Sequence, residues 1–210
     1  MKKVIVFGAT GRTGRYIVQY ALEAGHEVTA FARNNKSVVK HPGLSVVEGN
    51  ALDEQAVLNS IKGNEVVISA LGTDQLEGDA VNMMSEAMKI FIRAMKENNI
   101  LRVLAVGGLG VLQFNETMQL LDKPDYSPKY KAIGEGHNKV YQVLRQSQMD
   151  WTYVCCPDIV AAVKTERYRV NKDYPAEGLF KINTGDLANF IVKEMVEDKF
   201  LKTRVGICNY

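Results

Sequence analysis

The sequence predicts a single-domain α/β fold, a doubly wound and mostly parallel sheet with helices on both faces. Apolar runs of strand length alternate with amphipathic stretches of helix length from one end of the chain to the other, which is typical of repeated strand–helix units. The runs are rich in Val, Ile, Leu and Ala, as expected of strands covered on both faces. No linker composition divides the 210 residues, and a chain of this length can bury one substantial core without metals or cross-links.

The first half of the chain follows this strand–helix rhythm closely. Gly25 is placed to end the first helix, and Asp53 can cap the second by accepting hydrogen bonds from its first turn. In chain order, we expect strands at 3–7, 27–31, 44–47, 65–69 and 102–106, and helices at 12–24, 53–61 and 81–98.

The second half is less regular. Residues 113–128 carry no clean period and read as a loop or lid, within a substrate-side region formed by about 110–130 and 157–183. We expect a helix from Lys129 or Ala132 to Gln148, then a strand at 151–156 ended by Pro157. The remaining expected elements are a small hairpin of 167–170 with 178–182 over the carboxyl edge of the sheet, a helix at 186–197 capped by Thr184, and a last strand at 204–208.

The charge balance limits the partners of the protein. Lys and Arg total 26 against 24 Asp and Glu, so the chain lacks the basic excess of proteins that neutralise nucleic-acid phosphates. No window approaches the roughly 20 apolar residues that span a bilayer, and the chain start shows no cleavable apolar region. We therefore predict a cytoplasmic protein with a small-molecule acceptor as partner, no nucleic-acid or membrane partner and no metal site. A monomer is the default expectation, and a weak homo-oligomer stays open.

The three cysteines indicate no disulfide framework. Cys155 and Cys156 are adjacent on a predicted strand and therefore point to opposite faces, which leaves Cys208 without an obvious partner. We interpret all three as buried small hydrophobes in a reducing compartment.

The most informative segment is the glycine-rich turn between the first strand and the first helix, Gly8-Ala9-Thr10-Gly11-Arg12-Thr13-Gly14. Glycines allow a tight turn and a close approach to a pyrophosphate, and the amides and positive dipole end of the following helix attract its negative charge. Because a strand precedes the turn and a helix follows it, a dinucleotide-binding Rossmann site is favoured over a purely structural glycine turn. The G-x-x-G-x-x-G spacing is typical of relatives of the short-chain dehydrogenases.

The end of the second predicted strand indicates which cofactor is bound. An NAD-selective site places Asp or Glu there to accept hydrogen bonds from both ribose hydroxyls, whereas residues 31–35 read Phe-Ala-Arg-Asn-Asn. Arg33 offers a planar fork of donors to a 2′-phosphate, and Arg12 can add a second positive charge. We therefore predict NADP(H) as the cofactor, with solvated surface arginines as the alternative interpretation.

Further segments should meet at the same crevice, because doubly wound sheets bind ligands at the carboxyl ends of their strands. Asn50-Ala51-Leu52 follow the third strand and would lie beside the adenine, and Leu71-Gly72-Thr73 follow the fourth and could pass under the pyrophosphate and ribose. The predicted cofactor-binding set also includes Val106, Gly107, Gly108, His137, Pro157 and Ile159.

With these residues in place, the chain resembles an atypical short-chain dehydrogenase/reductase of the NAD(P)H-binding, NmrA-like group. Within the group it is most similar to the biliverdin-IXβ reductases, also called NADPH-dependent flavin reductases. The likeness implies a single-domain reductase that passes hydride from NADPH to a loosely bound flavin or a planar tetrapyrrole. It rests on Gly8 to Gly14 with Arg33, Met84-Ser85-Glu86, Ala94-Met95-Lys96, His137, Val143-Leu144-Arg145-Gln146-Ser147, Tyr153-Val154, Pro157, Ile159, Asp186-Leu187 and Tyr210.

The departures from this family bear on the chemistry. The usual short-chain enzymes carry a Tyr-x-x-x-Lys pair that trades a proton with a carbonyl or alcohol, and that place reads His137-Asn138-Lys139-Val140-Tyr141 here. Tyr141-x-x-x-Arg145 lies a turn later and is interpreted as ordinary helix surface or core. The family's substrate-side serine corresponds to Gly108, and its histidine after the sixth strand to Asp158. These two departures weigh against tetrapyrrole reduction, and the missing Tyr–Lys pair disfavours sugar epimerisation and alcohol dehydrogenation.

The candidate catalytic residues are His137 and Asp158. A flavin accepts hydride directly at N5 and needs mainly alignment, so His137 could hydrogen-bond the ribose or the acceptor and Asp158 could contact the acceptor or relay a proton. The alternatives are a packing role for His137 and a loop or capping role for Asp158. Tyr126 and Tyr130 could offer a stacking face or be ordinary loop residues.

Two functions remain in competition at this point. The first is an NADPH-dependent, flavin-reductase-like oxidoreductase that uses FMN or FAD as a dissociable acceptor. The second is a non-catalytic redox sensor that binds NADP(H) and changes its contacts with a protein partner, which requires different affinities for the two redox forms.

Overall fold

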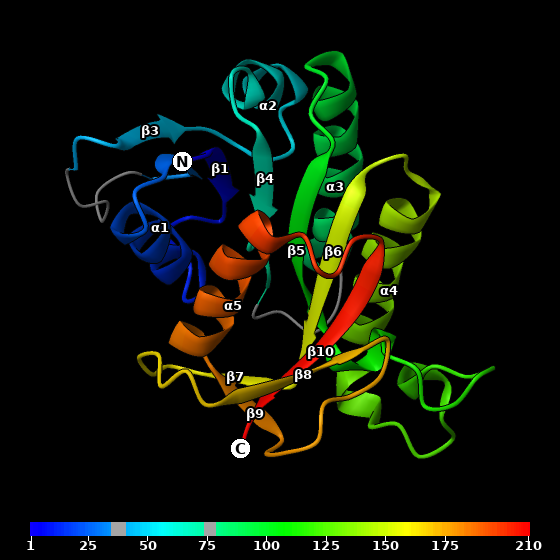
Figure 1. Ribbon diagram of the computed structural model, residues 1–210. Helices are drawn as coiled ribbons and strands as arrows, with labels where there is room; N and C mark the ends of the chain where they lie inside the picture. Colours follow the sequence, from blue (N-terminus) through cyan, green and yellow to red (C-terminus); the bar gives the residue numbers. More distant parts are fainter. Residues whose placement is uncertain (35–40, 74–78) are drawn as a thin grey trace.

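The computed structural model describes residues 1–34, 41–73 and 79–210 (Figure 1). Within these ranges an eight-stranded sheet has the order β3-β2-β1-β4-β5-β6-β10-β8. All neighbours are parallel except β8, which is antiparallel to β10. The strands are β1 (Lys3–Phe7), β2 (Glu27–Ala32), β3 (Leu44–Glu48), β4 (Val66–Ser69), β5 (Arg102–Gly108), β6 (Asp150–Cys156), β8 (Tyr168–Lys172) and β10 (Thr203–Asn209).

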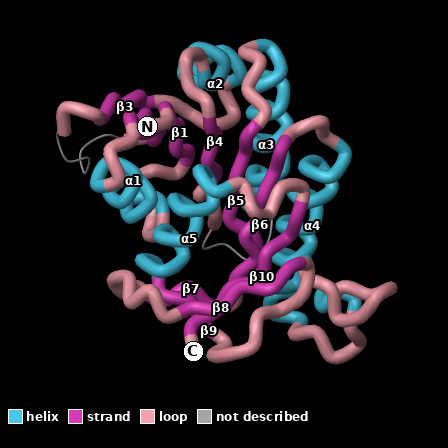
Figure 2. Tube along the Cα trace, in the orientation of Figure 1, coloured by secondary structure: helices cyan, strands magenta, loops and turns pink. Residues whose placement is uncertain are grey.

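Helices cover both faces of this sheet, as the sequence predicts (Figures 1 and 2). One layer consists of α1 (Gly14–Glu23) and α5 (Thr184–Glu197), which pack together. The other consists of α2 (Glu54–Ile61), α3 (Asp79–Glu97) and α4 (Lys131–Gln146), with α3 between its two neighbours. Each layer encloses its own apolar core. The doubly wound α/β prediction is confirmed.

The strand order places a switch point next to the glycine-rich turn. The chain moves outward from β1 through β2 to β3 and then returns to the other side of β1 with β4. Loops that leave β1 and β4 therefore diverge and open a crevice at the carboxyl ends of the strands. The aromatic core under this point joins β1 to α3, because the rings of Phe7 and Phe91 stack with centroids 3.9 Å apart.

Local signals predicted most boundaries in the first half. Asp53 caps α2 as expected, since its carboxylate accepts the backbone N–H of Ala56 at 3.0 Å. The cysteine prediction is also confirmed. All three thiols are free and buried, and Cys155 and Cys156 belong to the apolar cores on opposite faces of the sheet.

Two expectations for the second half are wrong. The segments near 168 and 181 do not form a hairpin, because β8 pairs with β10 whereas β9 (Lys181–Asn183) pairs in parallel with β7 (Asp158–Val160). Thr184 does not cap α5 but begins it, after Asn183 as the N-cap residue. Its hydroxyl instead donates to the carbonyl of Ala162 at 2.9 Å and accepts from the Ala162 N–H, so it fixes the loop before β8.

The segment 113–128 forms a loop that lies outside the crevice lining. Among the described residues, none between 109 and 130 lines the crevice. Leu121 within the segment and Leu112 directly before it are buried. Figure 1 shows the segment beside the start of α4, away from α1. Short turns shape it: η1 (Leu109–Val111), η2 (Leu120–Asp122) and η3 (Pro128–Tyr130).

Candidate functional site

A crevice of about 720 Å³ runs across the carboxyl ends of β1, β2, β4, β5 and β6. It brings together most of the residues that the sequence predicts: Gly8, Thr10, Gly11, Arg12, Thr13, Arg33, Asn50, Ala51, Leu71, Gly72, Thr73, Val106, Gly107, Gly108, His137, Pro157, Asp158 and Ile159. These residues come from both halves of the chain, so the crevice depends on the complete sheet.

The phosphate loop has the tight geometry that its glycines permit. Gly8 has a φ of +76°, and a Cβ there would lie 2.7 Å from the carbonyl oxygen of Ala70. The Gly11 N–H donates to the Gly8 carbonyl at 3.0 Å. A Cβ at Gly14 would lie 2.1 Å from that same Gly8 oxygen, so only glycine lets α1 begin so close to β1.

The amino end of α1 is arranged for an anion. The first turn of the helix holds no acidic residue, and the Thr13 side chain makes no capping hydrogen bond. The positive end of the helix dipole is therefore not neutralised by a carboxylate from the first turn of α1 itself. Close backbone approach and this helix end together fit the pyrophosphate of a dinucleotide.

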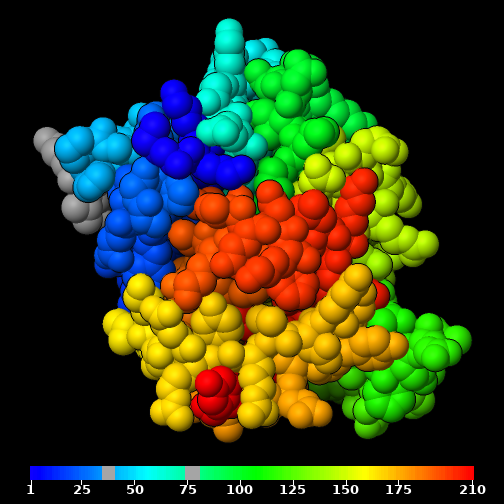
Figure 3. Space-filling model, viewed as in Figure 1, coloured from blue at the N-terminus to red at the C-terminus, as the bar shows by residue number. Residues whose placement is uncertain are grey.

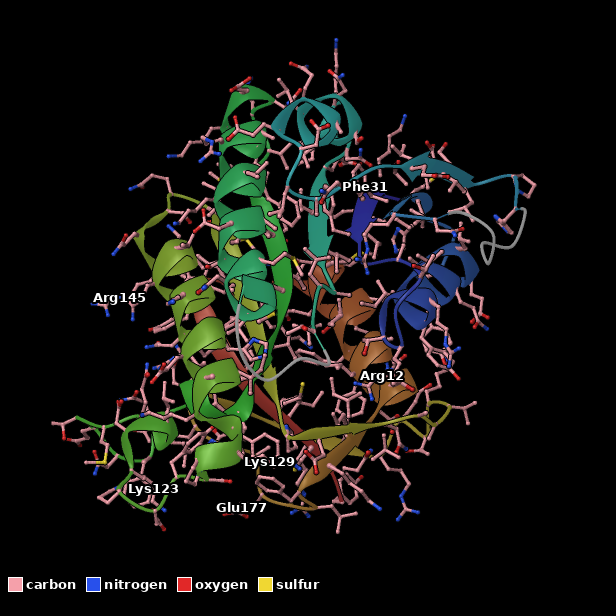
Figure 4. The ribbon with its side chains drawn as sticks, turned by 180° about the vertical axis from the view of Figure 1, so that it is seen from behind. Arg12, Phe31, Lys123, Lys129, Arg145 and Glu177 are labelled. Atoms are coloured by element: carbon pink, nitrogen blue, oxygen red, sulfur yellow. The ribbon has the colours of Figure 1, made fainter. Side chains whose placement is uncertain are left out.

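The two arginines predicted to select NADP(H) both line the crevice. Arg33 is exposed directly after β2. Arg12 lies in the phosphate loop, and Figure 4 labels it. Residues 31–34 hold no acid, and Asn35 lies outside the described residues. A negatively charged group next to the end of β2 would therefore meet the Arg33 guanidinium and no carboxylate from residues 31–34.

Three predicted cofactor residues lie outside the crevice lining. Gly14 packs under the loop against Gly8, where its role is to allow close contact between helix and strand. Ala9 is buried and borders a separate cavity between α1 and β3. The side chain of Leu52 is 41% exposed, because its turn is closed by Asn50, whose side-chain oxygen accepts the Leu52 N–H at 3.0 Å.

Sequence reasoning missed several lining residues. Gly49 makes room for Phe31, because a Cβ on it would lie 2.6 Å from that ring; its position directly after the third strand was the available signal. Met83 on α3 and Ile133 on α4 follow the helical apolar period and are indistinguishable from core residues in the sequence. The full missed set is Phe31, Ala32, Gly49, Ala70, Met83, Ile133 and Cys156.

His137 is a residue of α4, and its ring lies beside Gly108 at the end of β5. The side chain contacts Tyr153 from β6. Its Nδ1 is 3.1 Å from the Tyr153 hydroxyl, and that hydroxyl donates to the backbone carbonyl of His137, also at 3.1 Å. Burial lowers the pKa of His137 from 6.5 to about 4, because an imidazolium loses its hydration there. The ring is therefore neutral near pH 7.

The glycines at the end of β5 create the space for these two rings. A Cβ at Gly107 would lie 2.5 Å from the Tyr153 ring, and one at Gly108 would lie 2.6 Å from the His137 ring. The ring of His137 thus occupies the place that a side chain at position 108 would need. This is the physical consequence of glycine where the resembling family has serine.

Asp158 lines the same crevice as His137. It is exposed, follows Pro157 and begins β7. Of the region 157–183, only Pro157, Asp158 and Ile159 line the crevice. The rest forms a belt below α5, around the C-terminus, in Figure 3.

The packing of Tyr141, Tyr126 and Tyr130 shows where these three side chains lie relative to the crevice. Tyr141 is buried against Trp151, with ring centroids 5.9 Å apart, and Arg204 lies over its other side. Arg145 is exposed on the outer side of α4 (Figure 4), so the Tyr-x-x-x-Arg pattern is surface and core. Tyr126 packs near Gly110 and Gly134, and neither it nor Tyr130 lines the crevice.

No helix in the described ranges has the length and apolarity needed to cross a bilayer. The same ranges hold no group of three or more His, Cys, Asp or Glu side chains that could bind a metal ion.

Solved structures with full-length similarity carry names of two activities. A Streptococcus pneumoniae protein provisionally named an NADH-flavin reductase superposes with a TM-score of 0.88 at 26% identity, over 100% of both chains. A Bacteroides thetaiotaomicron protein provisionally named an epimerase superposes with a TM-score of 0.83 at 26% identity, over 100% of this chain and 97% of that one.

Sequence relatives include a protein of the same length class and longer plant reductases. The uncharacterised protein YwnB of Bacillus subtilis is 28% identical over 201 residues, which cover 92% of each chain. Phenylcoumaran benzylic ether reductase TP7 of Nicotiana tabacum is 31% identical over 165 residues, covering 73% of this chain and 48% of the relative. The chain therefore spans about half of that plant enzyme.

The switch-point crevice, the glycine-rich loop and these relatives define an atypical short-chain dehydrogenase/reductase type of protein. Residues 8–198 match the family described as NAD(P)H-binding, and the chain belongs to that family. Its cofactor is accordingly a nicotinamide dinucleotide, which the phosphate loop and the start of α1 fit in shape and charge.

Proposed function

We propose that this protein is an NADPH-dependent reductase that passes hydride to a dissociable planar acceptor, with FMN or FAD as the first candidates. The observation that carries the proposal is one crevice that extends from Arg33, after β2, past Arg12 in the phosphate loop to His137, beside the end of β5, and Asp158, after β6. Such a crevice can hold a dinucleotide along its length and leave its far end for a second ring.

The nucleotide end supplies the preference for NADPH. Gly8 to Thr13 would hold the pyrophosphate, and Arg33 would pair with the 2′-phosphate through charge-assisted hydrogen bonds. Without a carboxylate at the end of β2, the 2′-hydroxyl of NADH has no matching acceptor there.

The acceptor end aligns two rings and does little else. Its apolar lining comes from Met83, Ile133 and Ile159, on three different elements, which suits the flat face of a flavin. NADPH held by the phosphate loop and Arg33 would supply a hydride: its nicotinamide C4–H bond would break, an N5–H bond would form on the flavin as the electron pair reduces it, and water would supply the second proton. No Tyr–Lys pair is needed, because this hydride transfer has no alcohol or carbonyl to protonate.

The direct test is NADPH oxidation followed by absorbance, with and without FMN, FAD, riboflavin or a quinone, and with NADH in parallel. Oxidation that depends on the acceptor and prefers NADPH supports the proposal. Binding of both cofactors is measured on the same sample by fluorescence titration.

Tight NADPH binding without turnover of any of these acceptors would contradict the proposal. Different affinities for NADP and NADPH in that case would instead favour a redox sensor, since a ligand shifts a conformational equilibrium only by differential binding.

A further inference from the structure

The acceptor end of the crevice is defined by a histidine whose surroundings leave little freedom. The His137 ring fits into the space above Gly108, and the Tyr153 ring fits against Gly107. Gly107 and Gly108 pair with Cys155 and Cys156 in the sheet. The backbone of β5 is thus held by its ladder, and both rings are confined by it.

The two contacts of the Tyr153 hydroxyl determine which nitrogen of His137 carries the proton. A tyrosine hydroxyl has one proton to donate. When it donates to the carbonyl of His137, at 3.1 Å, the second contact of 3.1 Å to Nδ1 is a hydrogen bond only if Nδ1–H is the donor. This is the one arrangement in which both contacts are satisfied, and it leaves the lone pair of the neutral ring on Nε2.

The hydroxyl and the imidazole both keep these protonation states near neutral pH. Burial raises the pKa of Tyr153 well above its ordinary value of 10.0 and lowers that of His137 to about 4. Among the described residues Nε2 has no hydrogen-bond partner, while His137 lines the crevice. Asp158, after β6, also lines the crevice and carries carboxyl oxygens that can accept hydrogen bonds.

We propose that Tyr153 is a positioning residue that locks His137 in the Nδ1–H form, so that the imidazole presents a hydrogen-bond acceptor, Nε2, to the crevice and no N–H donor. The place on α4 where short-chain enzymes carry their proton-donating tyrosine then holds a group that cannot donate toward the crevice. The site accordingly takes ligands that offer an N–H or O–H edge, such as a ring imide, and leaves protonation of the reduced product to water.

This inference deepens the proposed function at the same site, and its first test does not depend on turnover. The tautomer of His137 is read in the full-length ¹⁵N-labelled protein from long-range ¹H–¹⁵N correlations at pH 7. The chain has three histidines, and His137→Gln assigns the signal. The expected result is a protonated Nδ1 and a pyridine-like Nε2. A protonated Nε2 in the wild-type protein overturns the proposal; should His137→Gln fail to fold, His26→Gln and His41→Gln assign the His137 signal by elimination.

The second test removes the hydroxyl that fixes the ring. Tyr153→Phe is expected to release His137 into a mixture of tautomers. Tyr168→Phe is the matched control, because it removes a hydroxyl that contacts Asn189 on the far side of the sheet. An unchanged His137 spectrum in Tyr153→Phe would refute the positioning role.

Kinetics distinguish this inference from the proposed function. With riboflavin and its N3-methyl derivative as acceptors, the wild-type protein should show a KM about tenfold lower for riboflavin, with kcat similar, if the imide N–H meets an acceptor. Tyr153→Phe should remove most of that difference, whereas equal KM values in the wild-type protein would overturn the predicted selectivity. Absence of turnover with the tautomer as expected would refute the reductase proposal and leave the positioning role of Tyr153 standing.

Discussion

The two ends of the crevice are built in different ways. At the nucleotide end, backbone geometry makes the site: Gly8 and Gly14 let strand, loop and helix approach within distances that a Cβ would forbid. At the acceptor end, buried side chains make the site, because His137 depends on Tyr153 and the neighbouring loops depend on Asp186 and Arg204.

The buried polar side chains of the acceptor half connect segments that are distant in the chain. The Asp186 carboxylate accepts the N–H groups of Thr165 and Glu166, both at 2.7 Å, and the side-chain amide of Asn209 at 2.7 Å. Arg204 donates to the carbonyl of Val111 at 2.6 Å. Buried side chains therefore hold the loops of the acceptor half in place, whereas close backbone contacts at Gly8 and Gly14 build the phosphate loop.

The largest effect is expected from added volume at the nucleotide end. Gly14→Ala places a Cβ 2.1 Å from the Gly8 carbonyl oxygen, and the free energy of unfolding should fall by about 4 kcal/mol as helix and strand separate. NADPH binding should be lost with it. Gly43→Ala is the control, because Gly43 is not among the crevice-lining residues and a Cβ there comes no closer than 3.4 Å to a neighbouring atom. Urea unfolding and NADPH titration of both variants measure the difference; equal behaviour would show that close backbone contact does not build this end.

The next effect is a pH dependence of stability from the acceptor end. The folded-state pKa of His137 is about 4, below the ordinary value of 6.5, so the unfolded chain binds a proton in this interval that the folded chain does not. The free energy of unfolding should therefore fall by about 3 kcal/mol as pH decreases from about 6.5 to 4.

Urea unfolding at several pH values tests this dependence. The pKa of His26 is also lowered by burial and contributes in the same direction, so the wild-type protein is compared with His137→Gln. That variant should show a flatter pH dependence, while His41→Gln, at an exposed position, should not. Parallel curves for wild type and His137→Gln would mean that the ring is not held neutral by burial.

A smaller loss of stability is expected from Asp186→Asn. In the wild-type protein the Asp186 carboxylate accepts from several N–H donors, and the variant turns an amide group toward those donors. The free energy of unfolding should therefore fall by about 2 kcal/mol. Hydrogen bonds from Asn209 and Thr165 oppose the effect of burial and lower the pKa of Asp186. The stabilisation that the ionised Asp186 gives the folded state is therefore present above the unfolded-state pKa of this group, and it is lost as pH falls through the folded-state pKa.

The functional readout separates the two ends for this variant. Asp186→Asn should raise the KM for the acceptor and leave that for NADPH nearly unchanged, because the loops it anchors lead to β7 and β9. Asp125→Asn, at an exposed loop position, is the control. A larger rise in the KM for NADPH would contradict the division of the crevice into two ends.

The smallest effect is expected from residues 113–128, which lie outside the crevice lining. Lys123 lies over the Phe114 ring and pairs with Asp125, away from the crevice lining. Lys123→Ala should change kcat and both KM values by less than about twofold, in line with ordinary surface substitutions. A substantial change in the KM for the acceptor would restore the lid interpretation.

The same contrast explains what the sequence could predict. The glycine-rich loop, the first five strands and Arg33 are encoded by local patterns, so their places were predicted correctly. The pairing of β8 with β10 and the role of Thr184 depend on which distant backbone is nearby, which no local pattern specifies. The Tyr153–His137 contact is of this second kind, because its partners lie 16 residues apart on different elements.

The central claim is that the Arg33 end of the crevice binds NADPH for hydride transfer to a planar acceptor at the His137 end. The most direct test compares kcat/KM for NADPH and NADH, with FMN as acceptor, in the wild-type protein and in Arg33→Ala, with Arg145→Ala as the control on the outer side of α4. Loss of a charge-assisted contact should lower the preference for NADPH by about 1.5 to 3 kcal/mol, while NADH kinetics stay nearly unchanged. An equal loss for both cofactors, or no acceptor-dependent oxidation in the wild-type protein, would contradict the account.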